Sequence, residues 1–330
     1  MCNFHVRFYR GIAFYITLSA SRAMKHSIKV SIALLSMFLA AQIIGLFVVS
    51  SYVDVAASKT ETEKAGKPVA VYEALPYNIE RPNLAPDTSF IFLGAGIAVG
   101  TLLLLLIIKF RKVSLWKIWF SLAVVITLTV AFSSFLPKAV AAILSIIIAY
   151  FRVLKPNILA HNVGELFVYG GLAAIFVPIM NIKSATILIL LVAAYDIFAV
   201  FKSKHMITLA KFQAENNMFA GLFVPKQLSL KTAVSEIKTA AAAQKSSRHT
   251  DKYSDSGNYA VIGGGDIGFP LLFAGVAMVN FGFFRTLLIP VFAVAALAIL
   301  LAIGKSGKFY PAMPFIAAGC FIGYAIASVL

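Results

Sequence analysis

Cysteine and charged side chains are both scarce in this chain of 330 residues. The two cysteines, Cys2 and Cys320, stand at opposite ends, and no Cys/His cluster has the spacing of a metal site. This pattern argues against a disulfide scaffold and a structural zinc ion, so we expect neither a metal nor another cofactor. Charged residues make up 13% of the chain, whereas a soluble domain carries about 25%. The shortage excludes an ordinary soluble protein.

Hydrophobic residues take the place of the missing charge. They make up 60% of the chain, and the mean hydropathy is +0.89, which is typical of a membrane protein with several crossings. Lysine and arginine number 29 against 13 acids. In a soluble protein this excess would indicate nucleic acid as a partner, but in a membrane protein it reflects positive charge held in cytoplasmic loops. We therefore expect contact with membrane lipids and no nucleic-acid partner.

Nine apolar segments come close to the length of about 20 residues that a helix needs to cross a bilayer. They cover residues 30–53, 89–108, 115–136, 139–154, 158–180, 184–203, 259–283, 286–304 and 309–330. The expected fold class is therefore an all-α polytopic membrane protein with nine transmembrane helices. Basic residues gather in alternate connections, so the positive-inside rule places the N-terminus in the cytoplasm and the C-terminus outside.

The chain divides into four regions on this basis. Residues 1–29 form an N-terminal segment without an assigned role, 30–203 hold helices one to six, 204–258 form a cytoplasmic, partly disordered linker, and 259–330 hold helices seven to nine. Two alternatives stay open for residues 1–23: Met24 is the initiator, or these residues are a frayed interfacial segment. Residues 206–223 favour an interfacial helix, and the prolines of the external connection 54–88 favour an irregular cap.

Two aspartates lie well inside apolar segments, where an acid costs about 2.5–3.5 kcal/mol to insert. Asp196 lies near the cytoplasmic end of the sixth segment, and Asp266 lies near the cytoplasmic start of the seventh. With a rise of about 1.5 Å per residue, both are expected roughly 10 Å inside the cytoplasmic boundary. Adjacent antiparallel helices would then bring the two carboxylates face to face across a partly hydrated cleft.

Paired carboxylates can hydrolyse a peptide bond without a metal or a covalent intermediate. Because two close carboxylates cannot both be ionised, they share one proton. The ionised partner accepts a proton from the attacking water, and the protonated partner donates to the oxyanion. Glycines 263–265 would let an extended substrate approach the backbone closely, and the rigid turn at residues 311–314 would wall the cleft.

Three short motifs resemble, in order, those of the presenilin and signal peptide peptidase family of intramembrane aspartyl proteases. Tyr195-Asp196 resembles the YD motif, Gly263-Gly264-Gly265-Asp266 resembles the GxGD motif, and Pro311-Ala312-Met313-Pro314 resembles the PAL motif, with methionine where leucine is usual. The resemblance is direct over about residues 184–330, and the chain looks most like a compact archaeal presenilin homologue.

This resemblance implies a site and a substrate class. Asp196 and Asp266 would be catalytic. The other motif residues would bind substrate or shape the site, namely Tyr195, Gly263, Gly264, Gly265, Pro311, Ala312, Met313 and Pro314. The implied substrates are single-span transmembrane proteins or peptides, the implied location is a prokaryotic cell membrane, and a homo-oligomer stays an open alternative.

A second class of function would use the same two acids. Asp196 and Asp266 would serve as ion ligands in an ion or proton-coupled transporter or a cation leak channel. Substitution of either aspartate would abolish activity in both cases, so the cleavage of a membrane-spanning peptide is the observation that separates them.

Several other residues are expected to have structural roles. Glu165 is expected to be a solvated carboxylate at the cytoplasmic start of the fifth segment, and the histidines, including His161, are expected in or near solvated connections. Close helix packing is expected at Gly94, Gly96, Gly100, Gly170 and Gly171.

Overall fold

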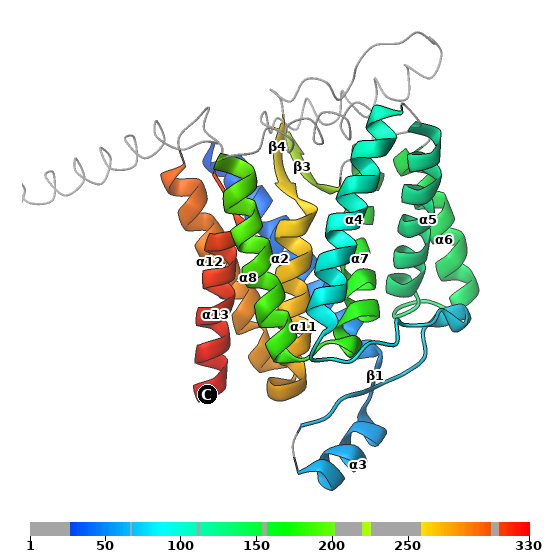
Figure 1. Cartoon of the computed structure of the whole chain (residues 1–330), viewed down its shortest axis with the longest axis vertical. Coiled ribbons are helices and arrows are strands. Elements are labelled where there is room, and N and C mark those ends of the chain that lie inside the picture. The colour runs from blue at the N-terminus through cyan, green and yellow to red at the C-terminus, as the bar shows by residue number, and fades with distance from the viewer. Residues whose placement is uncertain are drawn as a thin grey trace, which may run out of the picture.

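Long helices that run side by side make up most of the computed structural model (Figure 1). It describes residues 27–66, 68–110, 113–153, 157–201, 220–225, 259–304 and 310–330. The bundle helices are α2 (Ile28–Ser51), α4 (Ser89–Lys109), α5 (Val113–Phe132), α6 (Lys138–Val153), α7 (Ile158–Phe176), α8 (Ile182–Phe201), α11 (Gly264–Thr286), α12 (Leu288–Ile303) and α13 (Met313–Val329). Each predicted apolar segment overlaps one of them.

The length and apolar character of these helices suit a membrane. Among the described residues, six helices are long and apolar enough to cross it: α2, α4, α5, α7, α8 and α11. The others, α6, α12 and α13, have 16, 16 and 17 residues. Large apolar side chains face outward along the bundle, as Leu102 and Leu103 of α4 do. A helix that is apolar all round is the form that a lipid environment favours.

Glycines set the closest helix contacts in the core of the bundle. A Cβ atom added at Gly171 of α7 would lie 1.9 Å from the carbonyl oxygen of Thr127 in α5, and one at Gly170 would lie 3.1 Å from the Cα atom of Gly45 in α2. The expectation for Gly170 and Gly171 is therefore confirmed. It is wrong for three glycines of α4, because a Cβ atom there would meet nothing within 4 Å: Gly94, Gly96 and Gly100.

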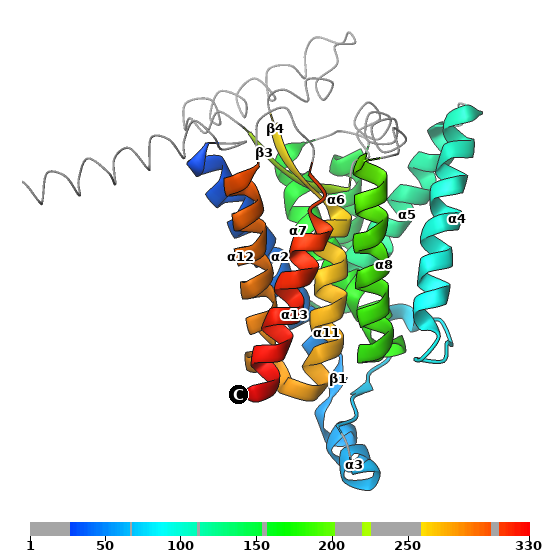
Figure 2. The same ribbon diagram turned by 60° about the vertical axis from the view of Figure 1, so that its left-hand side comes forward.

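The described part of the 54–88 connection and the strands at residues 221–225 and 259–263 lie at opposite ends of the bundle (Figures 1 and 2). The strands β1 (Val53–Asp54) and β2 (Val71–Tyr72), the helix α3 (Val55–Ala65) and the turn η1 (Pro76–Asn78) belong to the 54–88 connection; η2 (Val177–Ile179) ends α7. The predicted irregular cap is thus partly wrong. Asp54 caps α3 by accepting a hydrogen bond from the Ala57 N–H at 2.9 Å, and Gly66 ends the helix in the left-handed region.

At the other end, part of the predicted linker is a strand. β3 (Gly221–Pro225) pairs antiparallel with β4 (Tyr259–Gly263), with Gly221 opposite Gly263. Both are short runs rich in aromatic and branched residues, which favour strands. The expected interfacial helix over residues 206–223 is therefore wrong from Gly221 onward, and its remainder lies outside the described residues, as do residues 1–26. The seventh helix begins at Gly264, not at residue 259.

Candidate active site

The first predicted acid lies on α8 against the start of α13. Asp196 is 9% exposed, and its Oδ2 atom accepts a hydrogen bond from the backbone N–H of Met313 at 3.1 Å. The backbone of Ala312 supplies a second one. The first N–H groups of a helix have no partner within it, so they bind an anion well. Pro311 and Pro314 flank these donors. Because the contact is to the backbone, methionine in place of leucine leaves it unchanged.

The second predicted acid lies in the first turn of α11. Asp266 follows Gly263, which is the N-cap residue with extended backbone angles of −66° and 148°. The carboxylate of Asp266 accepts a hydrogen bond from the backbone of Gly263. A bond from the side chain of the third helical residue to the backbone of the N-cap residue stabilises the start of many helices. The positive end of the helix dipole also favours an anion there. Asp266 is partly exposed.

The packing of α8 against α11 and α13 brings the two acids into one neighbourhood. The charge of Asp196 acts on the carboxyl group of Asp266, although 70 positions separate them in the sequence. Each acid is held at the N-terminus of a helix, Asp196 by α13 and Asp266 by its own. The ring of Tyr195 is 56% exposed, so it lies toward the outside of α8, away from the packed interior.

Of the three glycines before Asp266, Gly264 has the closest neighbours. A Cβ atom there would lie 2.7 Å from the hydroxyl of Tyr169 and 3.3 Å from the carbonyl oxygen of Ala220. The N–H of Gly264 donates to that same carbonyl at 3.0 Å. At Gly263 and Gly265 the nearest atoms would lie at 3.4 and 3.5 Å, an ordinary contact. The motif therefore needs glycine in its middle for a physical reason that spacing alone does not reveal.

The two edges of the β3–β4 sheet differ. Side chains of α7 cover the outer edge of β3: His161 Nε2 donates to the carbonyl oxygen of Gly221 at 2.8 Å, and Asn162 bonds both the N–H and the carbonyl of Phe223. Since backbone groups alternate along a strand, Val261 of β4 directs its N–H and carbonyl away from β3. Among the described residues this sheet has two strands, so that edge of β4 has no strand partner there.

A comparison with known families identifies the chain. The family model described as signal-peptide peptidase, presenilin aspartyl protease matches residues 37–330. The chain belongs to this family. It is therefore an aspartic endopeptidase and an integral, multi-pass membrane protein, as the three motifs predicted. An archaeal relationship stays a prediction.

Solved structures support the fold of this presenilin-family protease. It is similar to a presenilin family intramembrane aspartate protease in space group C222, with a TM-score of 0.57 and 17% identity over 91% of this chain and 98% of the other. The same description in space group P2 matches with a TM-score of 0.55 and 17% identity over 90% and 96%. No curated protein matches the chain.

The protease also contains a polar contact near the site that sequence reasoning missed. Pro270 lies inside α11 and has no N–H for the carbonyl of Asp266, one turn earlier. Gln42 of α2, which is fully buried, donates to the next carbonyl, that of Ile267, at 2.8 Å. The side chain thereby supports the backbone of α11 directly after the acid. A lone glutamine within an apolar segment was the only signal.

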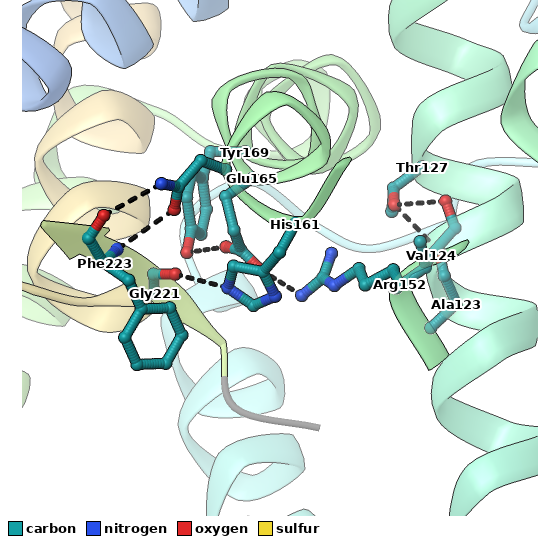
Figure 3. Close-up of polar contacts among 10 residues, drawn as sticks. Ala123, Val124, Thr127, Arg152, His161, Glu165, Tyr169, Gly221 and Phe223 are labelled. Carbon is teal, nitrogen blue, oxygen red and sulfur yellow. Dashed lines mark hydrogen bonds and ion pairs between the residues drawn. The ribbon is translucent and has the colours of Figure 1, made fainter. Parts of the chain in front are cut away.

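Two expectations about α7 are wrong. Glu165 is 0% exposed rather than solvated, and it forms an ion pair with Arg152 of α6. His161 is 7% exposed, and its ring packs against Phe223 of β3 (Figure 3). Because a carbonyl oxygen can only accept, the Nε2 atom of His161 carries a proton. Both residues turn inward because β3 covers this end of α7.

Proposed function

We propose that this protease hydrolyses peptide bonds within transmembrane helices of single-span membrane proteins, with Asp196 and Asp266 as its acid–base pair. One observation carries the proposal: the two acids come from different helices, the charge of Asp196 reaches Asp266, and each accepts main-chain hydrogen bonds at a helix start. Main-chain donors hold a carboxylate in place without adding a positive charge. The two carboxyl groups therefore stay able to share a proton.

In this mechanism, a water molecule between the acids attacks the substrate carbonyl. The ionised aspartate takes one proton from the water, and the protonated aspartate gives its proton to the carbonyl oxygen, which produces a tetrahedral diol. Collapse of the diol breaks the C–N bond as a proton passes to the leaving amine. The pair titrates as a unit, so the roles are not divided between Asp196 and Asp266. A shared proton predicts a bell-shaped dependence of rate on pH, and a flat profile would contradict it.

The substrate is proposed to bind as an extended segment along β4. A transmembrane helix keeps its peptide bonds within its own hydrogen-bond ladder, so it has to unwind before water can reach them. An added strand would satisfy the exposed backbone groups by pairing with the edge of β4 at Val261. β4 leads directly into Gly264 and Asp266, so a strand bound there passes beside the acids.

For the topology, we propose nine crossings with the N-terminus in the cytoplasm and the C-terminus outside, in a prokaryotic cell membrane. The start of α2 lies at the β3–β4 end of the bundle, and the C-terminus lies at the α3 end (Figures 1 and 2). The acids then lie toward the cytoplasmic side. Single cysteines placed in α3 and tested with an impermeant thiol reagent check this: labelling of intact cells is expected, and labelling only after lysis contradicts it.

The decisive experiment for the activity uses the purified protein in detergent with a peptide that has one apolar, membrane-spanning segment. Mass spectrometry is expected to find new termini inside that segment, and aspartyl protease inhibitors that mimic the tetrahedral intermediate should prevent them. Asp196→Asn and Asp266→Asn should yield no products, whereas Glu63→Gln on the exposed surface of α3 is the matched control. An intact peptide, together with ion flux in liposomes, would favour the transporter or leak channel instead.

A further inference from the structure

An ion pair is buried between α6 and α7, outside the pair of aspartates (Figure 3). Arg152 is 2% exposed and Glu165 is 0% exposed, and the guanidinium carbon of Arg152 lies 4.9 Å from the centre of the Phe120 ring in α5. A buried ion pair adds little to stability on average, because removing two charges from water costs about as much as their attraction returns. Stability alone therefore does not explain why this ion pair is present, and its place near the aspartates suggests a different role.

Glu165 is the centre of this cluster. Its carboxylate accepts hydrogen bonds from Arg152 Nη2, from the hydroxyl of Tyr169 one turn along α7, and from the backbone of Gly221. These three donors come from α6, α7 and β3. One fully buried carboxylate thus joins two transmembrane helices to the first residue of the strand.

Tyr169 carries this connection to the glycine motif. The ring is 4% exposed, and its hydroxyl occupies the space where a Cβ atom of Gly264 would lie. The charge of Asp266 reaches this hydroxyl. The hydroxyl donates a hydrogen bond to Glu165, which fixes its position. Gly264 therefore packs against an oxygen atom that cannot move freely.

A second connection reaches Gly264 through the strand. Glu165 binds the backbone N–H of Gly221 and His161 binds its carbonyl, and the neighbouring carbonyl of Ala220 accepts the N–H of Gly264. Both connections begin at Glu165 and end at the residue two positions before Asp266. Packing alone would not require that convergence.

We propose that Glu165, oriented by Arg152, is a positioning residue that acts through Tyr169 and β3 to fix Gly264 and thereby the place of Asp266. This inference rests on the proposed proteolytic function for its kinetic consequence, whereas its structural consequence, the ordering of Gly264, is independent of that function. A displaced general acid or base lowers the rate of the chemical step far more than substrate binding, since a shift of about 1 Å can cost on the order of 10²-fold.

The first test is Tyr169→Phe, which removes the hydroxyl and keeps the ring. We expect kcat for the membrane-spanning peptide to fall by about ten- to a hundredfold, with KM unchanged within about twofold because β3 keeps its bonds to His161 and Asn162. Tyr324→Phe is the matched control. Tyr324 lies on α13, and its ring also packs against aromatic side chains, those of Phe273 and Phe281. We expect no change in kcat or KM in this variant. Equal kcat in Tyr169→Phe and the wild type would overturn the inference.

A second set of variants separates positioning from folding. Arg152→Met with Glu165→Leu removes both charges and the acceptor, so kcat should fall as in Tyr169→Phe although the protein remains folded. Adding Tyr169→Phe to that pair should lower kcat no further, because Glu165→Leu has already removed the acceptor of the Tyr169 hydroxyl. Arg152→Met with Glu165→Gln restores a neutral acceptor, and kcat should recover to within about threefold of the wild type. Full activity of the Glu165→Leu pair would overturn the inference.

Hydrogen exchange supplies a readout that does not depend on catalysis. In Tyr169→Phe, amides in residues 259–266 should exchange about tenfold faster than in the wild type, and in Tyr324→Phe they should not. If the wild type cleaves no peptide, the proposed function is wrong while exchange still decides the positioning role. Unchanged exchange in Tyr169→Phe overturns that role even if the wild type is an active protease.

Discussion

Two kinds of acid occur within the helix bundle, and they differ in their partners. Glu165 has a cation, a tyrosine hydroxyl and a backbone group around its carboxylate. Asp196 and Asp266 have main-chain donors, and among the described residues neither has an ion-pair partner. An acid bound to a cation keeps its charge, whereas two acids near each other without one can exchange a proton. The first arrangement organises structure and the second permits chemistry.

The largest expected effect on activity comes from changing one of the two aspartates that have no cation beside them. Asp266→Asn should lower the rate of peptide cleavage by about 10²- to 10⁴-fold, the usual contribution of a general acid or base. The unfolding temperature should not fall, because the amide oxygen can still accept the bond from Gly263 and no cation loses its partner. Product formation and thermal unfolding in detergent are measured on the same preparation. A clear loss of stability would show that Asp266 resembles Glu165.

Removing the cation that pairs with Glu165 should lower stability, whereas the substitution of Asp266 should not. Arg152→Met leaves Glu165 charged and unpaired in the interior, which typically costs about 3–5 kcal/mol. A large fall in unfolding temperature is expected. Lys138→Met, on the exposed first turn of the same helix, is the control and should change stability little. Equal stability of the two variants would mean that the ion pair is not fixed in the folded protein.

The glycines of the helices also differ in their surroundings: some are in close contact with a neighbouring helix, and others have free space beside them. Gly171→Ala would place a methyl group 1.9 Å from the Thr127 carbonyl, so α5 and α7 have to separate at a cost of about 1–3 kcal/mol. Gly96→Ala meets nothing within 4 Å and should raise helix stability by about 0.5–1 kcal/mol. Thermal unfolding of both variants tests this pair. Similar losses would contradict the assigned helix contacts.

The smallest effect is expected at Tyr72 in the 54–88 connection, where a hydroxyl is buried without a hydrogen-bond partner among the described residues. Burial raises the pKa of Tyr72 to about 12. The unfolded chain releases this proton near pH 10, so between about pH 10 and 12 the folded state binds more protons and stability falls as pH rises. Tyr72→Phe should remove the contribution of Tyr72 to that loss. Identical pH dependence in both proteins would contradict it.

Local patterns were sufficient to predict the helices and to place Asp196 and Asp266 on two that are in contact, α8 and α11; the catalytic role of the two acids stays a prediction. Apolar runs near membrane length are self-evident in a sequence, and an acid inside one stands out as a single residue. β3 was missed because five suitable residues lie within a long polar connection. Glu165 was misjudged because its position near a helix start is typical of a solvated acid, and Arg152 looked like ordinary loop charge. Their pairing depends on how α6 and α7 meet, which no local pattern encodes.

The most direct test of the paired-acid mechanism is a comparison of three variants: Asp196→Asn, Asp266→Asn and the two combined. If the acids share one proton and act as a unit, each single substitution should lower peptide cleavage to the level of the double variant. Substantial cleavage by either single variant, with the losses multiplying in the double, would show that the two aspartates work independently and would contradict the mechanism.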